Sequence, residues 1–115
     1  MFLYDRTVGP YSETAGICPL NVYGESKAAA EEAILSAHKD ALVIRTTIVY
    51  EPEEHGKNFA YQLLSTLNAN ASVSCRTDQF STPTYNRDLA EMTVGLVEKN
   101  CTGLYNYAGP ETMSR

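Results

Sequence analysis

The sequence predicts an α/β fold with parallel strands. Helix-like and strand-like stretches alternate along the 115 residues, and Gly and Pro residues separate them. The strongest strand candidate is a nearly unbroken run of β-branched side chains, as expected of a parallel strand. The length allows one ordinary domain, and 43% hydrophobic with 20% charged residues is typical of globular proteins.

The first 19 residues predict a strand end followed by a long loop. Three segments then have the pattern of helices, with strong helix formers or one apolar face: residues 20–39, 58–68 and 86–100. Three further segments are expected to be extended: residues 41–50, 73–76 and 104–108. We expect the strand at 41–50 to be buried on both faces, and residues 79–84 to form a Pro-containing loop.

Charge and cysteine content exclude several classes of function. The net charge is −5 and the pI about 4.9, which argues against nucleic-acid binding and against a polybasic membrane surface. No apolar run approaches the length needed to span a bilayer, and no signal peptide is evident. The three cysteines, Cys18, Cys75 and Cys101, have no zinc-ligand spacing. These features predict a cytoplasmic chain with reduced thiols, no metal site and no membrane partner.

Tyr23 and Lys27 carry the clearest chemical signal. They are four residues apart on a predicted helix, so their side chains share one face. A phenol holds its proton up to about pH 10, but a nearby ammonium stabilises the phenolate. Such a tyrosine can exchange a proton with a carbonyl oxygen as a hydride arrives at or leaves the carbon. The spacing alone is also common among solvated helical surface pairs, so its context decides the interpretation.

The spacing of the glycines bears on cofactor binding. None of the seven glycines forms a G-x-G-x-x-G or G-x-x-G-x-x-G pattern. Such a pattern cradles the pyrophosphate of a dinucleotide at a helix N-terminus. We therefore expect these 115 residues to bind a dinucleotide cofactor poorly by themselves.

Several segments together resemble the extended short-chain dehydrogenases/reductases of the dTDP-4-dehydrorhamnose reductase type. The segments follow one another in the order of that family and cover essentially the whole chain: residues 9–13, 19–27, 30–31, 44–50, 56–59, 78–85 with 87–90, and 103–106 with 109–111 and 113–115. The resemblance implies a partial Rossmann-like doubly wound sheet with the substrate-side helices and short strands. Residues 1–115 would then be a single partial domain containing the active-site helix, the following strand and the substrate-side region.

The resemblance also implies a reaction: NADP- or NAD-dependent reduction of a nucleotide-linked 4-keto sugar. By position, Tyr23 would be the acid/base and Lys27 its electrostatic partner, and both would contact the cofactor. The substrate-binding positions would be Ile48, Asn58, Thr82 and Thr84. The cofactor-binding half and the Ser or Thr that polarises the carbonyl would precede this segment, so we expect the isolated chain to be inactive. Relatives of the rhamnose pathway tend to have Trp at the position of Ile48, which leaves the sugar open.

Two other interpretations stay open. The chain also resembles the non-catalytic regulatory subunit of methionine adenosyltransferase, which would make it a partner-binding protein. It would otherwise be a fragment without independent function. A sheet without its central strands would expose the edge of residues 41–50, so a protein partner or a second copy is expected to cover it. Arg45, inside this predicted strand, is expected to form a structural ion pair rather than to bind an anion.

Overall fold

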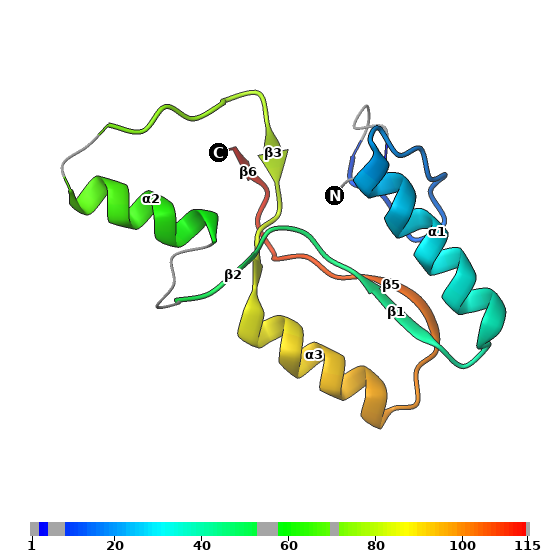
Figure 1. Ribbon diagram of the computed structural model, residues 1–115. Helices are drawn as coiled ribbons and strands as arrows, with labels where there is room; N and C mark the ends of the chain where they lie inside the picture. Colours follow the sequence, from blue (N-terminus) through cyan, green and yellow to red (C-terminus); the bar gives the residue numbers. More distant parts are fainter. Residues whose placement is uncertain (1–2, 5–8, 53–57, 70–71, 115) are drawn as a thin grey trace. The chain divides into compact units, whose positions relative to one another are not determined.

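The computed structural model describes residues 3–4, 9–52, 58–69 and 72–114 (Figure 1). The chain divides into two compact units. Unit 1 comprises residues 1–45 with 96–106, and unit 2 comprises residues 46–95 with 107–115. Helices and short strands alternate in both, and two of the three strand pairs are parallel, which confirms the predicted α/β class. A single partial domain over residues 1–115 stays a prediction.

Helix α1 (Val22–Ala37) is the helix of unit 1 that carries the predicted catalytic pair. Its start is fixed by Asn21, whose side-chain oxygen accepts a hydrogen bond from the Gly24 N–H at 2.8 Å. Its end follows from His38, which has an extended backbone at φ −141°. The helix is therefore two residues shorter at each end than predicted, and it packs most closely at Gly24, its one buried residue.

The parallel pair of unit 1 joins β1 (Leu42–Arg45) to β5 (Gly103–Asn106), in a register that runs from Leu42↔Gly103 to Arg45↔Asn106. Residues 42–44 are only half-buried, so the prediction of a strand buried on both faces was wrong. Among the residues that the structure describes, β5 is the one strand paired with β1. The second edge of β1 therefore has no neighbouring strand in this part of the chain.

Unit 2 contains two short strand pairs and two helices. The parallel pair is β2 (Val49–Tyr50) with β4 (Thr84–Tyr85), and the antiparallel pair is β3 (Phe80–Ser81) with β6 (Met113–Ser114). The helices are α2 (Phe59–Asn68) and α3 (Asn86–Glu98), the second of which ends in unit 1. Both begin and end within two residues of the predicted bounds. Residues 73–76, predicted as a strand, form none, and the predicted loop at 79–84 contains β3 and begins β4.

The predicted continuous strand at 41–50 is interrupted at residues 46–48. Ile48 has φ 42°, in the left-handed region that a β-branched side chain strongly disfavours. The interruption separates β1 from β2, and the two strands pair in different units. The β-branched run predicted the strand residues correctly but not this break.

The most deeply buried side chains of the described residues are few, and two of them are polar. Leu3 and Tyr4 are 5% and 2% exposed, and Arg45 is 5% exposed, all in unit 1. Thr84, in unit 2, is fully buried. Because buried polar groups need hydrogen-bond partners, Arg45 and Thr84 each form the centre of a polar network.

Candidate active site

Tyr23 and Lys27 lie on one face of α1, as the spacing predicts. Tyr23 is the second residue of the helix and its side chain is 56% exposed. The Lys27 Nζ lies 5.4 Å from the centre of the Tyr23 ring, within the range of a cation–π contact. A tyrosine with a lysine ammonium near its ring is a combination that acid/base chemistry can use. The catalytic role of this pair stays a prediction.

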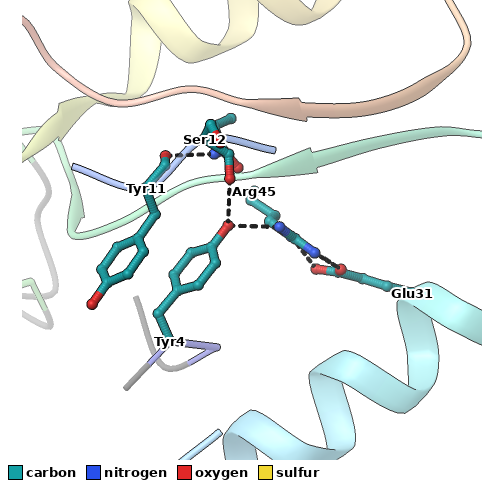
Figure 2. A network of polar contacts seen from close by, with 6 residues as sticks. Tyr4, Tyr11, Ser12, Glu31 and Arg45 are labelled. Carbon is teal, nitrogen blue, oxygen red and sulfur yellow. Dashed lines mark hydrogen bonds and ion pairs between the residues drawn. The ribbon is translucent and has the colours of Figure 1, made fainter. Parts of the chain in front are cut away.

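An ion pair joins α1 to the end of β1. Glu31 lies about two turns beyond Tyr23, and its carboxylate accepts hydrogen bonds from Arg45 Nε at 3.0 Å and from Nη2 at 2.7 Å (Figure 2). The two side chains are 4% and 14% exposed, so this bidentate pair is largely shielded from water. The hydrogen bonds to Glu31 raise the pKa of the Arg45 guanidinium, while burial acts in the opposite direction. The expectation of a structural ion pair at Arg45 is confirmed.

Tyr4 completes the surroundings of Arg45. Its hydroxyl accepts a hydrogen bond from Arg45 Nη1 at 2.6 Å and donates one to the Ser12 carbonyl at 3.4 Å. Figure 2 shows both contacts. The Tyr4 ring stacks on Tyr11, with ring centres 4.3 Å apart and planes within 3°. The loop before α1 is thereby attached to the same buried guanidinium that holds the helix.

The same loop is tied to the carboxyl end of β5. The Asn106 N–H donates to a Glu13 carboxylate oxygen at 2.8 Å, and Asn106 Nδ2 donates to the Tyr11 carbonyl at 3.0 Å. The backbone N–H of Asn106 lowers the pKa of Glu13, with a smaller contribution from the Arg45 charge. Ligands of doubly wound folds bind at the carboxyl ends of parallel strands, where Arg45 and Asn106 are register partners. Sequence reasoning missed Tyr4, Glu13 and Asn106, because no local pattern distinguishes them.

In unit 2, Thr84 connects β4 to the break at residues 46–48. Its backbone N–H donates to the Ile48 carbonyl at 3.1 Å. Its hydroxyl donates to the Thr47 carbonyl at 2.8 Å and accepts from the Thr46 hydroxyl at 3.2 Å. A left-handed conformation at a residue such as Ile48 costs about 1–3 kcal/mol and persists only where its surroundings enforce it. The hydrogen bonds of Thr84 are contacts made with residues 46–48, around this conformation.

Asn58 and Thr82, the other predicted substrate positions, also lie in unit 2. The Asn58 Oδ1 caps α2 by accepting from the Tyr61 N–H at 2.9 Å, and its Nδ2 donates to the Glu51 carbonyl at 2.7 Å. Thr82 is half-buried in the link between β3 and β4. The structure thus brings Ile48 and Thr84 together, whereas Asn58 serves as the N-cap of α2.

A hollow of about 570 Å³ lies between α2 and the ends of β2 and β4. Tyr50 and Tyr85, which are register partners, form one wall with ring centres 5.7 Å apart. The volume is within the range typical of small-molecule sites, and a largely apolar lining with a few polar groups is characteristic of such sites. The remaining lining residues are Glu51, Pro52, Ala60, Tyr61, Leu64, Ser65 and Asn68.

A dinucleotide cofactor presents ribose hydroxyls and a pyrophosphate, and both need hydrogen-bonding partners. Tyr23 and Lys27 are both exposed residues, and a phenol and an ammonium are hydrogen-bond donors of the kind that ribose hydroxyls accept from. The glycine pattern that would hold a pyrophosphate does not occur in the 115 residues. Within the described ranges, no helix is long and apolar enough to cross a membrane.

Comparison with known proteins identifies the family. The RmlD substrate binding domain matches residues 2–115. The dTDP-4-dehydrorhamnose reductase of Escherichia coli is 35% identical over 108 residues, and the match covers 90% of this chain and 36% of the relative. The dTDP-4-keto-6-deoxy-D-glucose reductase of Streptomyces niveus is 34% identical over 107 residues, with 91% of this chain and 36% of the relative covered. The chain thus spans a little over a third of the length of these relatives.

Solved structures show the same fold. A dTDP-4-dehydrorhamnose reductase from Clostridium acetobutylicum has the same fold with a TM-score of 0.90 at 21% identity, over 98% of this chain and 40% of the other. The dTDP-4-dehydrorhamnose reductase from Bacillus anthracis, in complex with NADP, has a TM-score of 0.82 at 28% identity, over 89% of this chain and 36% of the other. The partial Rossmann-like fold and the predicted resemblance are both confirmed. The chain belongs to the family of RmlD substrate binding domains.

Proposed function

We propose that this chain is the substrate-side segment of an NADP-dependent reductase that acts on a nucleotide-linked 4-keto sugar. The observation that supports this most directly is the exposed Tyr23–Lys27 pair on a helix that the buried Glu31–Arg45 ion pair fixes in unit 1. NADP is favoured over NAD, because a related reductase structure contains it.

In this proposal Tyr23 is the catalytic acid. The cofactor, when bound, would provide the hydride chemistry, and the Tyr23 hydroxyl would give its proton to the carbonyl oxygen of the sugar as that carbonyl is reduced to the alcohol. The Lys27 ammonium stabilises the resulting phenolate and holds the ribose of the cofactor. Tyr23 is 56% exposed, which supports this role.

The sugar nucleotide would be bound by unit 2. Ile48 and Thr82, both half-buried, would line the sugar site. Asn58 would shape it through the start of α2. The hollow beside Tyr50 and Tyr85 has room for one part of a nucleotide sugar, and tyrosine rings suit the apolar faces of sugars and bases.

A chimaera tests this function. Residues 2–115 replace the matching segment of the Escherichia coli reductase, and NADPH oxidation with the dTDP-4-keto sugar is followed. We expect turnover by the chimaera and a roughly 10²–10⁴-fold lower rate in its Tyr23→Phe variant, the usual contribution of a general acid. Tyr107→Phe serves as the matched control and keeps the rate of the parent chimaera. A folded chimaera without turnover, or an unchanged rate in Tyr23→Phe, contradicts the proposal.

A second candidate is partner binding without catalysis. Methionine adenosyltransferase 2 subunit beta of Xenopus tropicalis is 29% identical over 121 residues, and the match covers 99% of this chain and 36% of the relative. The unpaired edge of β1 in the described part of unit 1 offers a surface for another chain. Sedimentation of the chain mixed with a purified methionine adenosyltransferase catalytic subunit separates the two candidates. A stoichiometric complex supports partner binding, and independent sedimentation of both proteins contradicts it.

We also propose a cytoplasmic location, as in the sequence-based prediction. The support comes from the cysteines. Cys18, Cys75 and Cys101 are all free, and the first two are exposed. Exposed free thiols are typical of reducing compartments. Fractionation of the cells that make the protein, with immunodetection of the chain, checks this location.

A further inference from the structure

The hollow of unit 2 combines an aromatic lining with one acidic residue. Its volume is about 570 Å³, and three tyrosines line it: Tyr50, Tyr61 and Tyr85. Glu51 is the one carboxylate residue among the lining residues that the structure describes, and none of these is a lysine or an arginine. The faces of tyrosine rings carry partial negative charge. The lining therefore favours a positively charged ligand.

Two of the tyrosines form neighbouring walls of the hollow. Tyr50 and Tyr85 are register partners of β2 and β4, and their ring centres are 5.7 Å apart. The ring planes meet at 42°, so the rings are inclined to each other rather than stacked. A cation is attracted to an aromatic ring within about 6 Å of its centre. At this separation of the ring centres, one cation can lie within that distance of both rings.

Glu51 connects the elements that carry the tyrosines of the hollow. Its carbonyl oxygen accepts a hydrogen bond from Asn58 Nδ2 at 2.7 Å, and Asn58 Oδ1 accepts one from the Tyr61 N–H at 2.9 Å. The Glu51 carboxylate accepts a hydrogen bond from Asn86 Nδ2, and Asn86 directly follows Tyr85 in the chain. All of these residues belong to unit 2. The walls of the hollow are thus linked through one residue.

The Glu51 carboxylate has no ion-pair partner among the residues that the structure describes. The ion pairs found there involve other carboxylates, those of Glu31, Asp78 and Glu91. Its described donor, the Asn86 side-chain amide, is neutral, so the hydrogen bond leaves the negative charge in place. A pyrophosphate beside this carboxylate would be repelled. An ammonium group would be attracted both by the carboxylate and by the rings.

We propose that the three tyrosines of the hollow and Glu51 form an aromatic cage that binds an organic ammonium group. We term these four residues the tyrosine cage. Its volume is within the range typical of small-molecule sites. A quaternary ammonium and the protonated amine of an amino sugar both present a positive charge on an apolar frame, which is the chemistry that such a cage recognises. This inference goes beyond the proposed function and does not depend on reduction at Tyr23.

The first test compares two probes of the same shape on the isotope-labelled full chain. Choline carries a trimethylammonium group, and its neutral carbon analogue carries a tert-butyl group instead. NMR titration follows the ring signals of Tyr50, Tyr61 and Tyr85. We expect choline to shift these signals and to bind at least roughly tenfold more tightly than the neutral analogue. Equal affinities for the two probes, or no binding of choline, would overturn the proposal if UDP-glucosamine also shows no charge-dependent binding.

Two variants assign the binding to the tyrosine cage. Tyr61→Leu removes a ring that is 38% exposed, and Glu51→Gln removes the charge but keeps an oxygen for Asn86. We expect the affinity for choline to fall roughly three- to fivefold in each. Tyr107→Leu and Glu91→Gln change the same residue types outside the hollow and should bind choline like the parent chain. Unchanged affinity in both cage variants contradicts the assignment, and if one variant does not fold, the other decides.

A further comparison distinguishes a nucleotide-linked amino sugar from a free quaternary ammonium ligand. UDP-glucosamine and UDP-glucose differ only in an amine that replaces a hydroxyl, and the amine is protonated at mildly acidic pH. Tighter binding of UDP-glucosamine, with the difference lost in Glu51→Gln, supports the proposal and identifies an amino sugar. Equal binding of the two nucleotides, while choline still binds, supports it and identifies a free ammonium ligand. Because these probes undergo no reaction, loss of reductase activity in the chimaera leaves both results standing.

Discussion

The polar networks of the two units are built in opposite ways. In unit 1, a charged pair, Arg45 with Glu31, is shielded from water and joined by the Tyr4 hydroxyl. In unit 2, the neutral Thr84 makes its contacts with hydroxyls and backbone carbonyls. A buried charge without its partner is far more costly than a neutral group without one. The stability of unit 1 therefore depends on a few charged side chains, whereas that of unit 2 depends on close backbone packing.

The largest effect should come from breaking the ion pair of unit 1. Glu31→Ala leaves the Arg45 guanidinium buried without its carboxylate, which should lower the free energy of unfolding by about 3–5 kcal/mol. Glu91→Ala is the control, because it removes the partner of Arg87 from an exposed pair. It should cost about 1 kcal/mol or less. Urea titrations followed by NMR signals of each unit measure the free energy of unfolding of both variants. Equal losses in the two variants would contradict the assignment of Arg45 and Glu31 as a buried ion pair.

A double replacement tests the same ion pair without leaving an unpaired charge. Glu31→Leu combined with Arg45→Met removes both charges and leaves apolar side chains of similar size. We expect most of the stability lost in Glu31→Ala to return, because a buried ion pair often adds little over a packed apolar pair. Urea titration of the double variant checks this. A loss as large as that of Glu31→Ala would mean that the geometry of the pair, rather than the unpaired charge, is decisive.

An intermediate effect should come from the backbone packing of unit 2. Gly109→Ala forces its Cβ against the Pro83 carbonyl oxygen and should lower stability by about 1–3 kcal/mol, as overpacking does. Gly95→Ala is the matched control, since no atom lies within 4 Å of the added Cβ in α3. It should raise stability by about 0.5–1 kcal/mol. Thermal unfolding of both variants measures these changes in stability. An unchanged stability in Gly109→Ala would contradict the close contact between Gly109 and the Pro83 carbonyl.

The smallest effect concerns the exposed Glu13 in unit 1. Its pKa is lowered from the ordinary value of 4.5, chiefly by the Asn106 N–H. A carboxylate with a lowered pKa stabilises the folded state above its unfolded pKa, and that contribution is lost as the pH falls through the folded pKa. We therefore expect the Asn106 amide signal to shift as the pH falls below about 4.5, where Glu13 loses its charge. Glu13→Gln should abolish this acid transition, and its persistence in that variant would assign it to another group.

Helix positions were largely predictable, whereas the strand break was not. The helices at 22–37, 59–68 and 86–98 follow from side-chain periodicity and from caps such as Asn21 and Asn58, which act within one turn. The β-branched run at 41–50 predicted extended residues. It did not predict the turn at 46–48, because Thr84, which is hydrogen-bonded to the residues of the turn, is more than 35 residues away in the chain.

In the candidate site, too, some features were predictable from the sequence and others were not. The shared face of Tyr23 and Lys27 follows from a spacing of four residues on a helix, and the partner of Arg45 was expected although Glu31 was not named. The contacts of Tyr4, Glu13 and Asn106 were not predictable, since they join segments as much as 95 residues apart.

The sequence by itself determined the family, the α/β class, the helices and the face that carries Tyr23 and Lys27. These features depend on the periodicity of side chains and on the order of motifs along the chain, and both can be read from a sequence without a structure. The tertiary structure decided which polar side chains are buried, where the predicted strand breaks at Ile48 and which carboxylate pairs with Arg45. Those outcomes depend on hydrogen bonds between distant segments, and their energies are fixed only when the burial of both partners is known.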